Sequence, residues 1–195
     1  MIENVTKLFD DRLLKAIDLG SFDSPISEGW YGSVYKVKIF GKSYAIKTFK
    51  PTMHIDIEKL NVAAYDYHIL KTLNQSKYYP TIHAFKEREW MLVDWIDGIP
   101  FRNVSDKESF SSQMYDAYKD SVQAGWFPDD VKGNNLLYSN GSIMIIDVGA
   151  YLPVVSNIEY SITDRIEFVL KHADTYPSVR DESPYDFKIN YNGQS

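Results

Sequence analysis

Apolar residues recur at two different spacings along the chain, and the changes in spacing predict its elements. Near the start the spacing is helical, at Ile2, Val5, Leu8, Phe9, Leu13, Ala16 and Ile17. We therefore expect residues 1–20 to form an amphipathic helix that packs on the body of the domain. Residues 26–49 change to short strands with a tight break at Phe40-Gly41-Lys42.

The later segments continue this alternation between helix and strand. Helical spacing, then two short apolar runs, then two more helical stretches are expected at residues 55–73, 82–85, 90–93, 107–124 and 158–173. Gly125 is expected to end the fourth of these segments. The strands together would make a five-stranded antiparallel sheet.

Two apolar runs, at residues 136–138 and 143–146, are separated by Asn140-Gly141. Asn-Gly between such runs is a strong signal for a tight β-hairpin. That hairpin would bring Asn135 at one end beside Asp147 at the other.

The polar residues around this hairpin suggest a chemistry. Asp130, Lys132 and Asn135 follow one another at steps of two and three residues, and Asp147 ends an apolar run. Phosphoryl transfer uses such a set: a carboxylate that orients the attacking hydroxyl, a cation for the migrating group, and oxygen ligands for a metal ion. We expect Asp130 and Lys132 to be catalytic. Asn135 and Asp147 would bind Mg²⁺ or Mn²⁺.

Four segments in order resemble motifs of the protein kinase superfamily. The family's catalytic loop reads H-R-D-x-K-x-x-N and its metal-binding turn reads D-F-G; here they read P-D-D-V-K-G-N-N and D-V-G. Upstream, I-S-E-G-W-Y-G-S-V-Y at 26–35 resembles the glycine-rich loop, Y-A-I-K at 44–47 the strand that carries the lysine, and M-L-V-D-W-I-D-G at 91–98 the hinge. The resemblance covers roughly residues 26–150, and its order makes it more specific than any single motif.

The resemblance implies an α+β, two-lobed kinase-like fold. Its first lobe would hold the five-stranded sheet and one helix, and its second lobe would be reduced and mostly helical. We expect a single domain over residues 1–195, divided into the N-terminal helix (1–20), the first lobe (21–96) and a truncated second lobe (97–195).

The resemblance also implies an ATP site between the lobes. Lys47 would hold the inner phosphates, and backbone N–H groups from Gly29 to Gly32 would cover the outer ones. Ala45 lies two residues before Lys47 and so on the same strand face, where it would lie over the base. The other implied nucleotide contacts are Ile26, Val34, the backbone near Asp94 and Ile96, and Leu137.

The family holds its strand lysine with a glutamate from the helix of the first lobe. Register within residues 55–73 places Asp66 at that position, one methylene shorter than glutamate. Glu58, about two turns earlier, is the alternative partner, and both remain open.

Several positions depart from the family's motifs. Ser27, Pro128 and Val148 replace a glycine, a histidine and a phenylalanine. Asp129 stands where the family often has an arginine that pairs with a phosphorylated activation segment, so we expect activity that is not gated in that way. For Asp129 itself we expect a surface or capping role.

The chain is also short after its metal-binding turn, without the usual platform for substrate peptides. In this it is similar to minimal kinases, namely the small partner of the tRNA-modifying KEOPS assembly and compact bacterial effector kinases. Such proteins find substrates through a partner or by direct docking.

Composition narrows the function classes. The chain has 27 acidic and 21 basic residues, a formal charge of -6, which argues against a general nucleic-acid binder. It has no cysteine, so disulfides and thiolate chemistry are excluded. It has no apolar run long enough to span a bilayer and no basic leader, so we expect a cytoplasmic protein, either in its own cell or in a host.

The leading hypothesis is an ATP-dependent kinase that phosphorylates serine or threonine of a protein substrate, with an activating or docking protein as a further expected partner. Lys132 is the choice typical of serine/threonine kinases. A small-molecule phosphotransferase is a second hypothesis, although that family usually carries H-G-D and a histidine-like residue at the position of Lys132. A nucleotide-binding pseudokinase that acts as an interaction module is a third.

Overall fold

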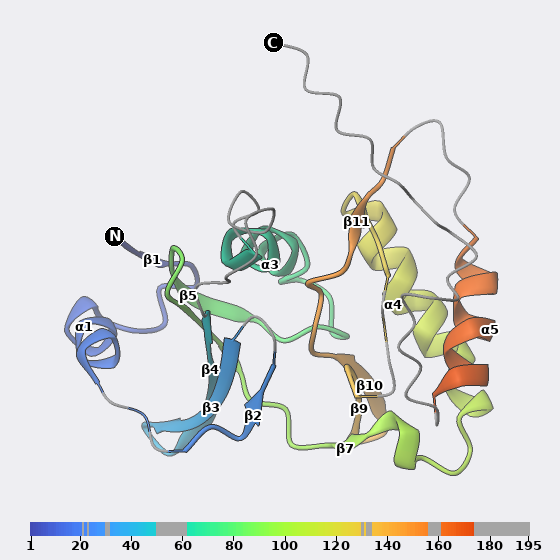
Figure 1. The fold of residues 1–195 in the computed structure, drawn as a ribbon, viewed down its shortest axis with the longest axis horizontal. Coiled ribbons are helices and arrows are strands. Elements are labelled where there is room, and N and C mark those ends of the chain that lie inside the picture. The colour runs from blue at the N-terminus through green and yellow to red at the C-terminus, as the bar shows by residue number, and fades with distance from the viewer. Residues whose placement is uncertain are drawn as a thin grey trace.

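A computed structural model describes residues 1–20, 22, 24–29, 32–49, 62–129, 131, 134–155 and 161–173. The described elements form two regions side by side (Figure 1). The first, the sheet region, comprises β1 (Ile2–Asn4), α1 (Asp11–Leu19), β2 (Ser27–Glu28), β3 (Gly32–Ile39), β4 (Lys42–Phe49), α3 (Val62–Thr72), β5 (Ile82–Lys86) and β6 (Trp90–Asp94).

The second, the helical region, begins with β7 (Ile99–Pro100) and two 3₁₀ turns, Phe101–Asn103 and Glu108–Phe110. It continues with α4 (Ser111–Gln123), β8 (Trp126–Phe127), β9 (Leu136–Ser139), β10 (Ser142–Ile145), β11 (Leu152–Pro153) and α5 (Ile162–His172). The helix expected at 107–124 is confirmed as α4 with a 3₁₀ turn before it, and Gly125 at φ 92° follows it. The last expected helix is α5; residues 156–160 lie outside the described residues.

The main sheet has six strands rather than the five expected. All its pairs are antiparallel, in the order β1-β5-β6-β4-β3-β2. The additional strand is β1, in which Ile2 pairs with Lys86 and Asn4 with Ala84. Three residues are too few to show an alternation in the sequence. The strand is stabilised instead by the free edge of β5, about eighty residues away.

The predicted N-terminal helix is shorter than expected. It begins only at Asp11, because Asp10 caps it by accepting the Leu13 N–H at 2.8 Å and Lys7 turns the chain at φ 55°. The apolar residues before it belong to β1 and the turn after it. The prediction that this helix packs on the domain is confirmed. It covers one face of the sheet, and its Leu14 belongs to a buried cluster there that also contains Phe9, Ile39, Tyr44, Ile46, Ala84, Trp90 and Leu92.

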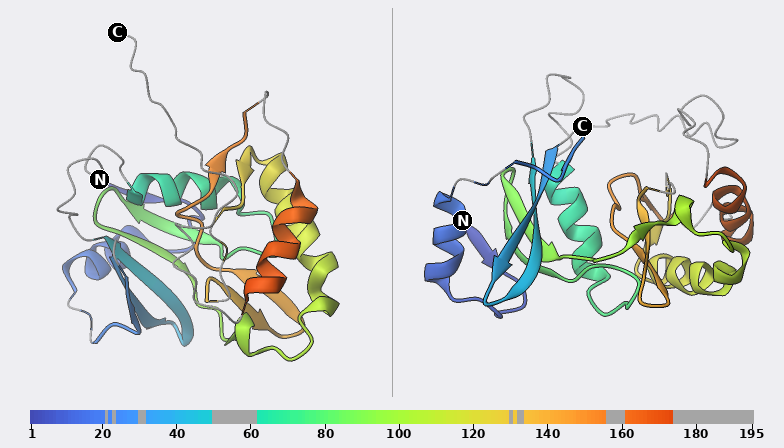
Figure 2. Two further views of the ribbon diagram at one scale, coloured as in Figure 1. Left: turned by 45° about the vertical axis from the view of Figure 1, so that its right-hand side comes forward. Right: turned by 90° about the horizontal axis from the view of Figure 1, so that it is seen from below.

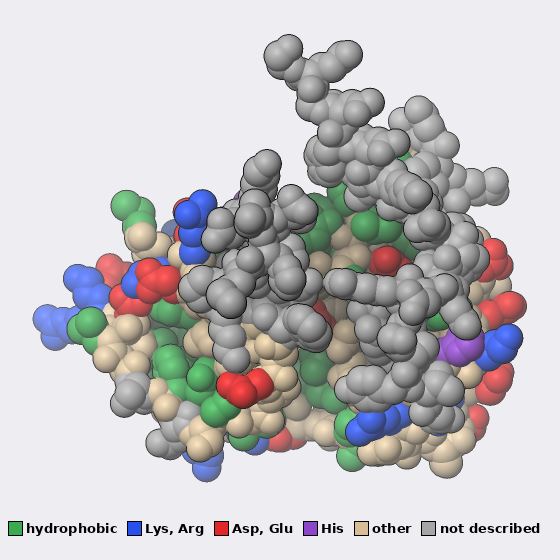
Figure 3. Space-filling view, in the orientation of Figure 1, with side chains coloured by type: hydrophobic (Ala, Val, Ile, Leu, Met, Phe, Trp, Pro, Cys, Tyr) green, Lys and Arg blue, Asp and Glu red, His purple; other side chains and the backbone are tan. Residues whose placement is uncertain are grey.

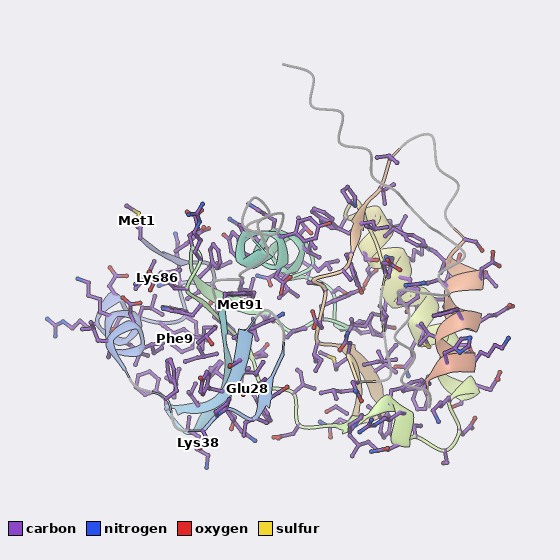
Figure 4. The ribbon with its side chains drawn as sticks, viewed as in Figure 1. Met1, Phe9, Glu28, Lys38, Lys86 and Met91 are labelled. Carbon is purple, nitrogen blue, oxygen red and sulfur yellow. The ribbon has the colours of Figure 1, made fainter. Side chains whose placement is uncertain are left out.

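The two faces of the sheet are covered by different helices. Figure 2 shows α1 on one face and α3 on the other, and Figure 4 labels Phe9 toward α1 and Met91 nearer α3. Along β4 the side chains alternate: Tyr44 and Ile46 belong to the α1 side, whereas Ala45 belongs to the cluster that continues into the helical region. The face expected to carry Ala45 and Lys47 is therefore the one that faces α3 and the helical region.

A tight hairpin joins β9 and β10, as the Asn-Gly signal predicts. Asn140 and Gly141 both have positive φ, 50° and 81°, which suits the two central residues of a type I′ turn. Ser139 pairs with Ser142 and Leu136 with Ile145. None of the described helices has both the length and the apolar character that a bilayer span requires.

Candidate nucleotide and metal site

One ammonium group is shared by carboxylates from two other segments. The Lys47 Nζ on β4 lies 2.5 Å from Asp66 Oδ2 on α3 and 3.5 Å from Asp147 Oδ1, which follows β10. Asp66 is 1% exposed, whereas the Asp147 side chain is 45% exposed. Of the two acids considered for Lys47, the structure brings Asp66 to it, and Glu58 lies outside the described residues.

Charge and burial act against each other in this triad. Burial alone would lower the pKa of Lys47, but the carboxylates of Asp147 and Asp66 outweigh it and raise that pKa above its ordinary value. Burial raises the pKa of Asp66; Lys47 opposes this shift and Asp147 adds to it. Lys47 is therefore held as a cation, with an excess of acidic groups around it that favours a further cation nearby.

The turn after β10 closes directly against α3. The Gly149 N–H donates to Asp147 Oδ1 at 3.1 Å. A Cβ at Gly149 would lie only 2.9 Å from Asp66 Oδ1, a buried atom without a hydrogen-bond partner. In addition, the Tyr65 hydroxyl donates to the Tyr151 carbonyl. The bond from Tyr65 thus ties the segment after the D-V-G turn to α3; nothing in the local sequence pattern singles out Tyr65.

The hairpin places Asn135 next to Asp147. The Ile146 N–H donates to the Asn135 carbonyl at 2.9 Å, which extends the β9–β10 pairing by one step. No group of three or more His, Cys, Asp or Glu residues that could hold a metal occurs among the described residues. A site with one carboxylate and one amide suits Mg²⁺, which usually takes one or two protein ligands and completes its shell with substrate phosphates and water.

The segment that resembles a glycine-rich loop is a narrow hairpin between β2 and β3. The Ile26 N–H donates to the Val34 carbonyl and the Gly29 N–H to the Gly32 carbonyl, at 2.8 and 2.9 Å. The Gly29 N–H, expected to cover phosphates, is thus engaged inside the loop. At Gly32 a Cβ would lie 1.8 Å from the Thr48 carbonyl oxygen, so only glycine fits there. The hairpin tip, Trp30-Tyr31, lies outside the described residues.

The expected base-side contacts lie on the inner face of the sheet and on β9. Ala45 is 7% exposed and pairs with Val93, which belongs to the same buried cluster. Val34 packs against that cluster, Leu137 on β9 is half-buried, and Ile26 is 62% exposed. Val93 was not among the predicted contacts. It precedes Asp94 in β6, however, and successive residues of a strand face opposite sides of the sheet.

Asp94 presents its side chain to the opposite, α1-facing side. It pairs across the strands with Tyr44 and accepts from the Lys42 Nζ at 3.0 Å; its Oδ1 also lies 3.1 Å from His83 Nε2. The backbone N–H of Asp94 donates to the Thr81 carbonyl at 3.0 Å. The carboxylate therefore braces the outer face of the sheet. Ile96, the other expected hinge residue, is half-buried between β6 and β7.

Replacing Asp94 by asparagine should lower stability by about 2 kcal/mol at neutral pH, because charge-assisted bonds are lost. Burial tends to raise the pKa of this carboxyl, but the bonds from His83 and Lys42 outweigh it and hold that pKa well below its ordinary 3.8. The folded state then binds fewer protons than the unfolded state. The stabilisation is present above pH 3.8 and is lost as the pH falls toward the folded pKa.

Thermal unfolding of the native protein and Asp94→Asn between pH 7 and pH 2 should show the gap between them close. Asp97→Asn is the matched control, since that side chain is 80% exposed and pairs with Lys36 at the surface. A gap of constant size across this range would contradict the assignment.

The two predicted catalytic residues, Asp130 and Lys132, lie outside the described residues, and their roles stay predictions. Their neighbours are placed: Phe127 pairs with Leu152, and Val131 is 4% exposed. Asp129 lies partly at the surface, as expected, with its side chain 37% exposed, but it also makes a contact that was not expected. Its carboxylate forms an ion pair with Arg165 of α5, which is itself buried. The sequence offered no signal for this pair.

Comparison with family models finds no match, and comparison with curated proteins finds none either. Among solved structures, the chain is similar to the Rio2 kinase of Chaetomium thermophilum in its ADP/Mg²⁺-phosphoaspartate complex. The similarity has a TM-score of 0.61 at 17% sequence identity, and covers 82% of this chain and 58% of the Rio2 chain. The chain therefore has a protein kinase-like fold and spans little more than half the length of that relative in structure.

Proposed function

We propose that this protein is an ATP-dependent kinase that phosphorylates serine or threonine of a protein substrate. The observation that carries the proposal is the triad of Lys47, Asp66 and Asp147, in which one half-buried ammonium lies between carboxylates from two different segments. The kinase-like fold supports the same conclusion, since the Rio2 relative was solved with ADP and Mg²⁺.

In this proposal Lys47 binds the inner phosphates, and Asp66 keeps its side chain extended toward them. Asn135 and Asp147 would hold Mg²⁺, which neutralises phosphate charge when bound. Asp130 would orient the acceptor hydroxyl, and Lys132 would stand near the group in transfer. Catalysis would then consist of positioning and electrostatic stabilisation.

The surface supports a protein rather than a nucleic acid as substrate. Acidic and basic side chains are interspersed over the described part of the face shown in Figure 3, and the chain carries a net charge of -6. A docking or activating protein remains part of the proposal.

The test is transfer of label from ATP by the intact protein in the presence of Mg²⁺. Acceptors should include generic protein substrates and, separately, aminoglycosides and sugars. We expect phosphoserine or phosphothreonine on protein, lost on chelation by EDTA and in the Lys47→Met variant, which excludes a contaminating kinase. Label only on small acceptors would favour a small-molecule phosphotransferase. A nucleotide-induced rise in Tm without any transfer would favour a pseudokinase.

A further inference from the structure

Arg165 is an unusual residue in this fold because its charge is buried. Among the described Asp, Glu, Lys and Arg residues, only Arg165 and Asp66 are buried, at 5% and 1% exposed. Burying a charge is costly unless it is paired. The buried charge at Asp66 serves the candidate site, which raises the question of what Arg165 serves.

The surroundings of Arg165 compensate its charge incompletely. Its guanidinium forms an ion pair with Asp129 and lies 5.3 Å from the centre of the Phe168 ring. Its Nε and the hydroxyl of buried Tyr118 have no hydrogen-bond partner. Burial raises the pKa of that tyrosine, and the nearby Arg165 charge opposes the shift. An apolar side chain would fill such a site at lower cost, so the pair with Asp129 calls for an explanation other than stability.

Asp129 lies in the segment that links β8 to the β9–β10 hairpin. At one end of this segment Phe127 pairs with Leu152, and at the other the Asn135 carbonyl accepts the Ile146 N–H. Between these anchors lie the buried Val131 and the Asp129–Arg165 ion pair. Asp129 is also the residue immediately before the predicted catalytic Asp130.

We propose that Arg165 is a positioning residue: through its ion pair with Asp129 it ties α5 to the loop between β8 and β9, of which the structure describes residues 128, 129, 131, 134 and 135. Asp129 in the loop and Arg165 on α5 supply the two opposite charges of this contact. Its consequence for catalysis rests on the proposed kinase function, whereas its effect on loop order does not.

The experiment compares the full-length protein with Asp129→Asn, which keeps the shape of the side chain and removes its charge. Arg165→Met is the second variant. Hydrogen exchange of peptides that cover 127–136 reports the order of the loop without any need for activity. We expect exchange in this loop to rise at least tenfold in Asp129→Asn. We also expect kcat to fall by about 10- to 100-fold, with KM for ATP within twofold, since a loop displaced by about 1 Å is enough for such a loss.

Asp18→Asn provides the matched control. It removes another partly buried ion pair between a helix and its neighbouring segment, in which the Lys86 Nζ lies 2.8 Å from Asp18 Oδ1, between α1 and β5. A general loss of stability would affect both variants alike, whereas a positioning role affects the loop only in Asp129→Asn.

Unchanged exchange at 127–136 in a folded Asp129→Asn protein would overturn the proposal, whether or not the enzyme is active. If Arg165→Met is too unstable to purify, Asp129→Asn alone decides. A native protein that transfers no phosphate would overturn the proposed function instead, while the exchange data would still decide the role of Arg165.

Discussion

Replacing Lys47 by methionine should lower the rate of phosphoryl transfer on the order of 100-fold and destabilise the fold by about 3 kcal/mol. Lys47 is the only cation that the structure places within an ion-pair distance of Asp66 among the described residues. Methionine keeps most of the side-chain length but leaves the Asp66 carboxylate, 1% exposed, without its ammonium partner. Urea unfolding and initial-rate kinetics measure the two effects separately.

The double variant Lys47→Met/Asp66→Asn separates function from stability. The amide at position 66 removes the unpaired buried charge, so stability should return to within about 1 kcal/mol of the native protein. Activity should stay lost, because the ammonium proposed to bind the phosphates is still missing. A double variant as unstable as the single one would show that the unpaired carboxylate is not the source of the destabilisation.

The single variant should also show a characteristic pH dependence. Burial already raises the pKa of Asp66 while Lys47 opposes the shift, so removal of Lys47 raises that pKa further. The folded state then binds more protons than the unfolded state. The stability of Lys47→Met should therefore fall as the pH rises above the ordinary Asp value of 3.8, and protonation at low pH should restore it.

The parts of this architecture that were predictable from sequence are encoded over short distances. Alternation along β4 indicated that Ala45 and Lys47 share a face, and Asn140-Gly141 indicated the hairpin that sets Asn135 beside Asp147. In these two cases one strand or one turn carries the pattern, so a single sequence contains it. Asp66 was expected as a partner for Lys47, with Glu58 as the alternative, only from the resemblance to the kinase family and the register of residues 55–73.

The parts that were missed depend on contacts between distant segments. β1 forms only because the edge of β5 accepts it, and without that edge Ile2 and Val5 look like the start of a helix. The Asp129–Arg165 pair joins residues 36 positions apart, and a lone arginine in an amphipathic helix gives no sign of burial. The contacts of the Asp94 side chain with Lys42 and His83 were also missed, because they depend on the pairing of β6 with β4 and β5; the expected backbone contact of Asp94 stays a prediction.

The site itself joins three segments that no local pattern links. β4 supplies Lys47, α3 supplies Asp66, and the turn after β10 supplies Asp147. Gly149 permits the contact between the last two, since any side chain there would meet Asp66 Oδ1. The close approach of α3 offers a reason why aspartate serves at this position where the kinase family has glutamate: the shorter side chain already reaches Lys47 at 2.5 Å.

Replacing Asp147 by asparagine should lower phosphoryl transfer on the order of 1,000-fold without unfolding the protein. Asparagine keeps an oxygen that can accept the Gly149 N–H, now at 3.1 Å, but it lacks the charge that a magnesium ion requires. Mg²⁺ should accordingly no longer raise the affinity for a fluorescent ATP analogue. Asp116→Asn on α4, a carboxylate that accepts from the Tyr78 hydroxyl at 3.2 Å, is the matched control and should retain full activity.

The same substitution should leave stability unchanged or slightly raise it. Asp147 adds to the shift that raises the pKa of buried Asp66, so two like charges are held close together in the folded protein. Removing one of them relieves that repulsion, while Lys47 keeps its closer partner. A more stable but inactive Asp147→Asn protein would mark this carboxylate as a group retained for function at the expense of the fold. A variant that loses stability and keeps its activity would show that Asp147 is structural and that the metal assignment is wrong.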